Sequence, residues 1–291
     1  MRFAYYNSCS LRSTGKEYDK SIRAVFNRLD VKLIEPENWV CCGSTIAHNV
    51  SHLLSIALPM KNLAEIEKEG FAEVIVPCTA CYSRFKIAQH DMKNRPGLKE
   101  QVEEVIEYKF KGEIKVLHPL EVLAREDMLK LLAEKVEKDL SGLKVVSYYG
   151  CLLVRPPKII GFDDVCEYPE TMDKILKAVG INTLDWSHKT ECCGGSLAVS
   201  RPDIVKSLSK RILDDAKEVG AEAISVPCTF CHLNMDTRQE ELAQEYSVNY
   251  DMPIVYFTEL VALALGEPAN KLWLNKHIVD TGSILQKVAA K

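Results

Sequence analysis

The chain has 291 residues, of which 47% are hydrophobic, so it can bury a sizeable core, and this excludes a disordered protein. Its 37 basic and 41 acidic residues give a formal net charge of −4 without a long run of one sign, so nucleic acid is not an expected partner. Its longest apolar runs, such as 260–265, are far shorter than the roughly 18 residues that span a bilayer, and its first residues lack the apolar stretch of a signal peptide. We therefore expect a cytoplasmic protein without a transmembrane segment.

Short apolar runs of strand length alternate with stretches of helical periodicity along the whole chain. In the first half, the pattern predicts strands at 3–6, 31–34 and 74–76, helices at 16–29 and 45–68, and a strand leading into a helix at 114–124. In the second half, it predicts strands at 145–149, 181–184 and 223–226, helices at 167–179 and 197–219, and a similar strand and helix at 254–263. Strands that alternate with helices predict parallel sheets flanked by helices, so the fold class is α/β.

A charged helical stretch at 121–138, followed by Ser141-Gly142, is the best candidate for a linker between the halves. Its mixed charges are typical of a solvated helix face. We place the boundary after residue 141, which predicts one domain over residues 1–141 and a second over 142–291. The apolar segment 258–265 matches a helix of the repeat, so we expect it in the core.

Ten of the eleven cysteines form two equal sets, and only Cys166 is left over. The first set reads C-x31-CC-x35-C-x2-C and the second reads C-x40-CC-x34-C-x2-C. The offsets between matching cysteines are 142, 151, 151, 150 and 150, which indicates a duplication whose main length change follows the first cysteine. The flanks agree, since Tyr5-Tyr6 matches Tyr148-Tyr149. The two sets are Cys9, Cys41, Cys42, Cys78 and Cys81, and Cys151, Cys192, Cys193, Cys228 and Cys231.

Several of these cysteines closely follow predicted strands, so we expect both sets at the carboxyl edges of the sheets, where α/β domains bind ligands. A Cys-x-x-Cys pair is a ligand element of both zinc and iron–sulfur sites. Zinc takes four ligands and adjacent cysteines chelate one ion poorly, whereas neighbouring thiolates can reach different irons of a cluster. Five thiols in each set therefore favour an iron–sulfur cluster in at least one half. Zinc in both halves and plain packing of small thiols are the alternatives, and we expect Cys166 to be a free thiol.

The doubled pattern, with Cys41-Cys42-Gly43 and Cys192-Cys193-Gly194-Gly195, resembles the duplicated CCG cysteine-rich domains of the B-subunit family of heterodisulfide reductase over nearly the whole chain. This resemblance implies two tandem Rossmann-like domains, each with a noncubane [4Fe-4S] cluster held by its five cysteines. It implies that all ten cysteines are catalytic metal ligands in reversible disulfide/thiol chemistry. The unequal spacings allow one half to hold another cluster type or zinc.

The same domain also resembles the cysteine-rich subunits of unconventional succinate dehydrogenases, thiol:fumarate reductases and lactate oxidation complexes. A noncatalytic electron-transfer or quinone-reducing subunit is therefore the second hypothesis, and a zinc-stabilised scaffold is the third. The chain has no G-x-G-x-x-G motif after a strand, so we expect its electrons to come from a partner. The resemblance implies a ferredoxin-like iron–sulfur subunit and a flavin-containing subunit as partners, and a small-molecule or carrier-bound disulfide or thiol as substrate.

Basic and glycine residues near the cysteines are secondary candidates. An anionic disulfide needs cationic neighbours, although a solvated or structural role is the plainer expectation for each of them. Glycines after the CC pairs are predicted to permit tight turns and to offer backbone amides to sulfur. The candidates are Arg12, Arg84, Arg155, Lys158, His48, His118, His232, Gly43, Gly194 and Gly195.

Overall fold

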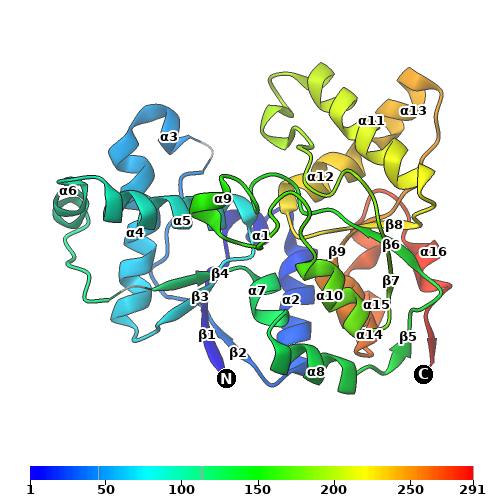
Figure 1. Cartoon of the computed structure of the whole chain (residues 1–291), viewed down its shortest axis with the longest axis horizontal. Coiled ribbons are helices and arrows are strands. Elements are labelled where there is room, and N and C mark those ends of the chain that lie inside the picture. The colour runs from blue at the N-terminus through cyan, green and yellow to red at the C-terminus, as the bar shows by residue number, and fades with distance from the viewer. Residues whose placement is uncertain (45, 113, 291) are drawn as a thin grey trace.

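The computed structural model describes residues 1–44, 46–112 and 114–290, and it contains two four-stranded parallel sheets (Figure 1). The strand order is β2-β1-β3-β4 in the first sheet and β7-β6-β8-β9 in the second. The strands of the first are β1 (Arg2–Tyr5), β2 (Lys32–Ile34), β3 (Glu73–Ile75) and β4 (Lys115–Leu117). The strands of the second are β6 (Lys144–Ser147), β7 (Asn182–Leu184), β8 (Ala223–Val226) and β9 (Ile254–Tyr256). The same α/β unit thus occurs twice, as the duplication predicts.

The helices of each half connect these strands. Those of the first half are α1 (Cys9–Arg12), α2 (Lys16–Arg28), α3 (Ala47–Val50), α4 (His52–Lys68), α5 (Thr79–Asn94), α6 (Leu98–Val105), α7 (Pro119–Leu123) and α8 (Glu126–Glu134). Those of the second half are α9 (Pro157–Ile160), α10 (Thr171–Ala178), the short 3-10 helix η1 (Gly195–Leu197), α11 (Pro202–Glu218), α12 (Thr229–Thr237), α13 (Gln239–Tyr246) and α14 (Phe257–Ala264). The chain then adds α15 (Ala269–Leu272), the 3-10 helix η2 (Leu274–Lys276) and α16 (Gly282–Leu285).

Four helices form a layer between the two sheets. Helix α2 packs on α14, and α7 packs on α10, so each contact joins the two halves (Figure 1). Since α2 and α10 follow the first strand of their units, and α7 and α14 follow the last, the two contacts are reciprocal. Near the middle of this layer, the hydroxyl groups of Ser21 and Thr258 lie 2.6 Å apart in the interior.

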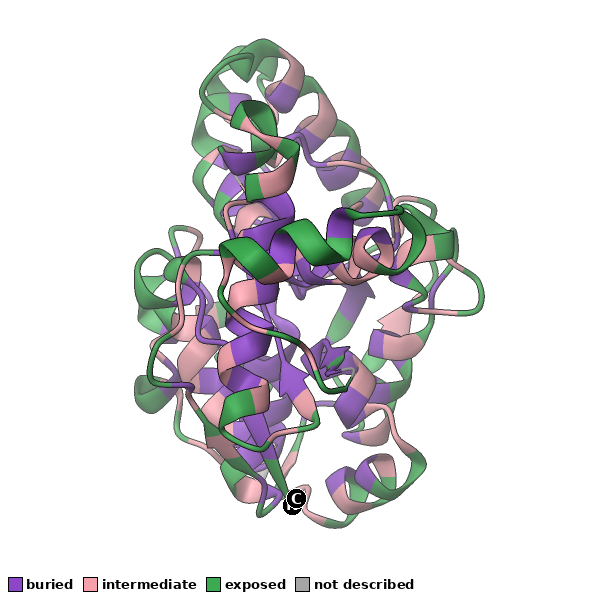
Figure 2. Cartoon of the chain, turned by 90° about the vertical axis from the view of Figure 1, so that its left-hand side faces the viewer, coloured by how far each residue is buried: buried purple, intermediate pink, exposed green. Residues whose placement is uncertain are grey.

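The outer helices pack away from this central layer. In the first half, α4 contacts both α5 and α6, and in the second half α12 contacts α13. Figure 2 shows that buried residues gather on the strands and the inward helix faces, with exposed residues on the outer turns. Every residue of α14 is buried, which confirms that the apolar segment at 258–265 is core.

Strand register follows the repeat closely. Ala4 of β1 pairs with Val74 of β3, and Val146 of β6 pairs with Ile224 of β8. A further antiparallel pair joins β5 (Lys138–Asp139) to β10 (Ala289–Ala290), which ties the segment between the sheets to the end of the described chain. The domain boundary after residue 141 stays a prediction, and the two large sheets lie on either side of it.

Four predicted helices are shorter or broken in the structure. The helix predicted at 45–68 is two helices, because Ser51 has an extended backbone and its hydroxyl accepts from the amide of Leu54 at the start of α4; Thr45 lies outside the described residues. The segment predicted as one helix at 121–138 contains the end of α7 at Leu123, the separate helix α8 and the start of strand β5. The helix predicted at 167–179 begins at Thr171, whose amide donates to Asp163. The helix predicted at 197–219 begins at Pro202, since proline suits the first helical position.

Candidate metal centre

Several cysteines of the two sets lie where a strand has ended and a helix begins. Cys9 begins α1 after β1, while Cys78 and Cys228 immediately precede α5 and α12 after β3 and β8. Free N–H groups at a helix start favour a negative charge, so these positions suit thiolates. The CC pairs lie in the loops that follow β2 and β7. In the view of Figure 1, α1, α5, α9 and α12 lie on the upper side of the strands.

The first set is a cluster of thiols in mutual contact. The sulfur atoms of Cys42 and Cys81 are 3.0 Å apart. Donation from the thiols of Cys41 and Cys81 lowers the pKa of Cys42, and the same contacts raise the pKa of both donors. Donation from Cys81 lowers the pKa of Cys78 to about 7, while burial and then the thiol of Cys78 raise the pKa of Cys9. Cys9 and Cys41 are exposed, so solvent reaches one side of the set.

The second set repeats this arrangement. The sulfur atoms of Cys193 and Cys231 are 3.5 Å apart, and those of Cys151 and Cys192 are 3.7 Å apart. Donation from Cys151 lowers the pKa of Cys192 to about 6, and donation from Cys231 lowers the pKa of Cys193. The pKa values of Cys151 and Cys231 are raised by the same contacts. Cys228 is buried beside Cys231.

These two thiol clusters fit iron–sulfur clusters. All eleven cysteines are free thiols, and the sulfur separations are well above the roughly 2.05 Å of a disulfide bond. Neighbouring thiolates also repel one another, which adds to the raised pKa values of some thiols of each set, and a bound polynuclear cation removes that repulsion. Five soft sulfur donors exceed the four ligands of a zinc ion. The donor set of each half therefore suits an iron–sulfur group.

Glycines shape the loop after each CC pair, as predicted. Gly43 and Gly194 have φ values of +73° and +75°, the left-handed region that favours glycine. The amide of Gly43 donates to Sγ of Cys41 at 3.4 Å, and the amide of Gly194 donates to Sγ of Cys192 at 3.3 Å. Each glycine thus turns the loop and directs a backbone N–H at sulfur.

A tyrosine side chain forms a hydrogen bond with the loop that carries each CC pair. The hydroxyl of Tyr6 donates to the carbonyl of Val40 at 2.6 Å, and that of Tyr148 donates to the carbonyl of Glu191 at 2.6 Å. Both carbonyls belong to the residue just before the CC pair. The two tyrosines are therefore equivalent, with the offset of 142 that Cys9 and Cys151 also have. The predicted match of Tyr5-Tyr6 to Tyr148-Tyr149 was wrong by one residue.

The two cysteine sets meet across the interface between the halves. The hydroxyl of Thr79, next to Cys78, donates to Sγ of Cys228 at 2.9 Å in the interior. His118 supports the same region, because its Nε2 donates to the carbonyl of Pro77 at 3.0 Å. Burial lowers the pKa of His118 to about 3, so this histidine is neutral and has a structural role.

Sequence reasoning named His232 but missed the rest of a buried network beside the second set. Nε2 of His232 lies 2.9 Å from Nδ1 of His277, whose Nε2 donates to Glu259 at 2.9 Å. Burial alone would lower the pKa of His277, but the Glu259 carboxylate raises it to about 9, so the pair is ionic. Asp236 lies within 4.8 Å of both histidines, and its oxygens accept from the amides of Ile278 and Val279. A signal for Glu259 existed in the sequence, since it is the third residue of α14 and makes the same capping box that Glu121 makes in α7.

The cationic candidates have unequal surroundings. The charge of Arg84 helps to lower the pKa of Cys42, after the larger effects of Cys41 and Cys81. Arg155 donates to the carbonyl of Thr190 at 2.7 Å and pairs with Glu167, which places it beside the second CC loop. Of the others, Arg12 pairs with Glu35 at 2.6 Å, and Lys158 and His48 are exposed.

Cys166 lies apart from both sets. It is half-buried in the longer segment after Cys151, and its thiol is 4.0 Å from a carboxylate oxygen of Glu167. Its contacts agree with the expectation of a free thiol.

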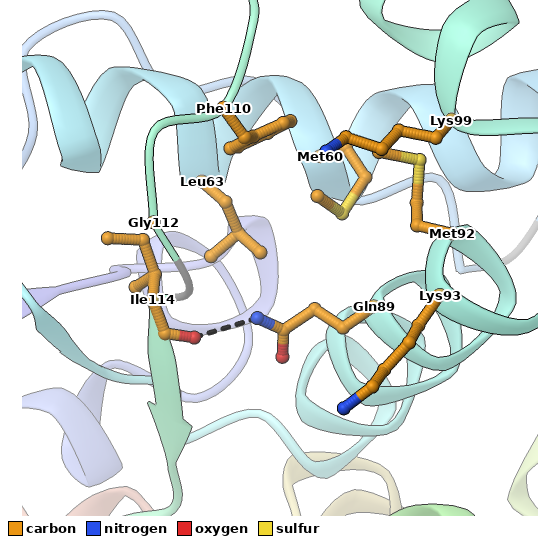
Figure 3. A pocket seen from close by; sticks show the side chains of 9 residues that line it. All are labelled: Met60, Leu63, Gln89, Met92, Lys93, Lys99, Phe110, Gly112 and Ile114. Atoms are coloured by element: carbon orange, nitrogen blue, oxygen red, sulfur yellow. Dashed lines mark hydrogen bonds between the residues drawn. The ribbon is translucent and has the colours of Figure 1, made fainter.

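A pocket of about 210 Å³ lies away from the cysteines, against α4, α5 and the loop before β4 (Figure 3). Its walls include Met60, Leu63 and Met92, with Lys93 and Lys99 among the lining residues. The amide of Gln89 closes one side by donating to the carbonyl of Ile114 at 2.7 Å. No cysteine is among the residues that line it, so this pocket is separate from the thiol clusters.

The cysteine-rich domain model named CCG matches residues 3–86 and 145–236. The chain belongs to the CCG cysteine-rich domain family. Both matched segments contain one complete five-cysteine set, as predicted from the duplication. Among the residues that the structure describes, no helix combines the length and apolar character needed to cross a membrane.

Two curated CCG relatives align over nearly all of this chain. One, 30% identical over 96% of this chain and 97% of its own length, is the 8-methylmenaquinol:fumarate reductase membrane anchor subunit of Wolinella succinogenes. Another, 24% identical over 99% of this chain and 97% of its own length, is the B subunit of the ferredoxin/F420H2-dependent CoB-CoM heterodisulfide reductase of Methanosarcina acetivorans. The resemblance to the heterodisulfide reductase B subunit is thus confirmed. Both relatives are subunits of redox enzymes, which supports an electron-transfer role for this chain within a multi-subunit complex.

A solved structure has the same fold. A crystal structure of a hypothetical protein from Helicobacter pylori superposes with a TM-score of 0.78 at 13% identity, covering 96% of this chain and 52% of that one. The chain thus spans about half the length of that structure. At this identity the likeness shows the fold alone, and it agrees with the two parallel sheets described above.

Proposed function

We propose that the chain is the iron–sulfur subunit of a heterodisulfide reductase-like complex, in which two noncubane [4Fe-4S] clusters serve reversible disulfide/thiol chemistry. The observation that carries this proposal is the meeting of the two cysteine sets across the interface, where the Thr79 hydroxyl lies 2.9 Å from Sγ of Cys228. In the reductive direction, the S–S bond of RSSR breaks, two electrons and two protons are taken up, and two RSH molecules leave. When bound, each cluster would supply one electron, so a facing pair matches this demand.

The ten cysteines would hold the clusters as thiolates: Cys9, Cys41, Cys42, Cys78 and Cys81 in the first half, and Cys151, Cys192, Cys193, Cys228 and Cys231 in the second. The hydrogen bonds of Tyr6 and Tyr148 would hold the two CC loops in place. The glycine after each CC pair would direct an N–H at sulfur. Arg84, close to Cys42, is the best-placed cation to attract an anionic disulfide to the first set. Exposure of Cys9 and Cys41 would admit the substrate there.

The electrons would come from partner subunits, a ferredoxin-like iron–sulfur protein and a flavin-containing protein. Subunit names among the relatives support a complex of this kind. The cytoplasmic location expected from the sequence stays a prediction.

A second candidate function is electron transfer from a quinol in a fumarate reductase-type complex. The Wolinella relative favours it, because that protein is a subunit of an 8-methylmenaquinol:fumarate reductase and is 30% identical to this chain. In this case both clusters would relay electrons, and no disulfide would bind between them.

Metal analysis of anaerobically purified protein tests the cofactor assignment first. About eight irons and eight acid-labile sulfides per chain would support two four-iron clusters. About four irons with one zinc, or zinc alone, would contradict the two-cluster proposal. Electron paramagnetic resonance on the same sample would report the cluster type.

Oxidation of the reduced protein then separates the two functions. The chain would be reduced with dithionite and then exposed, in separate experiments, to the heterodisulfide of coenzymes M and B or to a water-soluble menaquinone analogue. Rapid oxidation by the disulfide, with release of two thiols, supports disulfide chemistry. Oxidation by the quinone alone supports the second function. A Cys81→Ser variant that kept full disulfide reduction would contradict the catalytic assignment.

A further inference from the structure

A tyrosine of the first half is buried beside the second cysteine set. Tyr18 lies on α2, is shielded from solvent, and its hydroxyl has no hydrogen-bond partner among the residues that the structure describes. An unpaired buried hydroxyl costs free energy, and folded proteins supply a partner for almost every such group. Tyr18 therefore offers a donor for an acceptor that is not a protein side chain or backbone group.

The ring of Tyr18 is held in one orientation by the second half. It stacks on Tyr256 with ring centroids 4.3 Å apart and an interplanar angle of 6°, and it meets the edge of Phe257 at 6.3 Å. One turn along α2, the hydroxyl of Ser21 lies 2.6 Å from that of Thr258. These contacts fix both the helix and the ring, so the hydroxyl cannot turn toward solvent.

Two cysteines, one from each set, are near enough to act on this hydroxyl. Burial raises the pKa of Tyr18, and the thiols of Cys228 and then Cys78, one from each set, raise it further. The first half already donates one hydrogen bond into the second set, from Thr79 to Sγ of Cys228 at 2.9 Å. Tyr18 would be the second donor from the same side.

The arrangement is one-sided. The repeat places Tyr168 where the first half has Tyr18, since Glu17-Tyr18 recurs as Glu167-Tyr168 with the offset of 150 that strands β2 and β7 also have. Tyr168 is exposed, and its hydroxyl contacts Asp185 and the carbonyl of Trp186. A hydroxyl at this position therefore crosses the interface in one direction only.

We propose that Tyr18 donates a hydrogen bond across the interface to a sulfur atom of the second-half metal centre and raises the reduction potential of that centre. This inference rests on the iron–sulfur function proposed above. A hydrogen bond to sulfur stabilises the reduced state, which carries the greater negative charge. The second-half centre is then the easier of the two to reduce, and electrons move toward it.

Redox titration of the full-length, cluster-loaded protein tests this inference. Tyr18→Phe removes the hydroxyl and keeps the stacked ring, and Thr79→Val removes the donor already directed at Cys228. The control is Tyr168→Phe, because Tyr168 is exposed and its hydroxyl contacts Asp185 and the carbonyl of Trp186. Iron content, midpoint potentials and exchangeable-proton couplings in electron–nuclear double resonance are measured for each protein.

The expected result is full iron content in Tyr18→Phe, a lower midpoint potential for one centre, and loss of one exchangeable-proton coupling from that centre. Thr79→Val should lower the potential of the same centre, and Tyr168→Phe should match the wild type. Unchanged potentials and couplings in iron-replete Tyr18→Phe would overturn the inference, as would shifts of different centres in the two variants. A wild-type chain that takes up no iron would instead refute the proposed function itself.

Discussion

Tyr6 and Tyr148 make the same hydrogen bond in the two halves, each from its hydroxyl to the carbonyl that precedes a CC pair, at 2.6 Å. Both side chains are almost completely buried. Removing either hydrogen bond affects the CC loop of only one cysteine set, so each half can be perturbed separately.

Tyr6→Phe should loosen the first CC loop and Tyr148→Phe the second. Each change leaves a carbonyl without its partner and should lower the free energy of unfolding by about 1 to 3 kcal/mol. Iron per chain should fall in each variant, and the spectrum of the other half should persist. Iron analysis, electron paramagnetic resonance and denaturant titration check this. Tyr246→Phe, on the exposed side of α13, should behave like the wild type.

Cys81→Ser should lose roughly one cluster of the two, because serine is a harder ligand than thiolate and the set is left with four thiols. Cys166→Ser should keep all of its iron, since among the described residues the hydrogen-bond contact of Cys166 is with Glu167 rather than with a cysteine of either set. Iron and sulfide analysis of both variants decides this. Loss of iron from Cys166→Ser would show that the eleventh cysteine is a ligand.

The buried pair of His277 and Glu259 should make stability depend on pH. The folded pKa of His277, about 9, lies above the ordinary value of 6.5, so the pair stabilises the fold fully below pH 6.5 and this contribution is lost as pH rises through 9. The loss is about 3 kcal/mol at most, from the size of the shift. Unfolding free energies of the wild type and His277→Gln should converge between pH 6.5 and 9.5. Since both proteins share every cysteine, parallel curves would refute the ion pair.

Gly43→Ala should be strongly destabilising. Its φ is +73°, and a Cβ there would lie 2.7 Å from side-chain atoms of both Ala47 and Leu58. The left-handed backbone alone costs about 1 to 2 kcal/mol for a residue with a side chain, and the clash adds to it. Gly142→Ala is the control, because that glycine has open space around it and no positive φ. Equal melting temperatures of the two variants would contradict this account.

The Ser21–Thr258 contact measures the coupling of the two halves. Ser21→Ala leaves the buried hydroxyl of Thr258 without its partner, at a cost of about 1 to 3 kcal/mol. Thr258→Val should cost less, because the hydroxyl of Ser21 still donates to the carbonyl of Tyr18 at 3.0 Å. The double variant should cost less than the sum of the two, because the Thr258 hydroxyl is then no longer left unpaired. Denaturant unfolding of the four proteins completes the cycle. Strict additivity would mean that the contact contributes nothing.

Much of the fold follows from local pattern. The alternation of apolar runs and helical stretches, with the offsets of about 150 residues, predicts two parallel α/β units and brings each set of five cysteines to one edge. The errors have local physical causes. Ser51 interrupts a predicted helix because its hydroxyl caps the helix that follows. The predicted match of the tyrosines was wrong by one residue because both segments contain two adjacent tyrosines.

The features between the halves were not predictable from the repeat. Glu17-Tyr18 recurs in sequence as Glu167-Tyr168, yet Tyr18 is buried against the other half and Tyr168 is exposed. His277 lies beyond the repeated segment, so no counterpart marked it. The packing of one unit on the other determines the burial of Tyr18 and the placement of His277. A sequence pattern that describes each unit alone contains no information on this packing.

The central helix layer also bears on the ancestry of the chain. Helix α2 of the first unit meets α14 of the second, and α10 of the second meets α7 of the first, so the same two helix positions are used from both sides. This is the geometry of an isologous contact between two identical subunits. The two halves are thus arranged like the subunits of a homodimer, joined in tandem within one polypeptide. Once joined, each copy was free to change by itself, and the buried Tyr18 against the exposed Tyr168 is such a change.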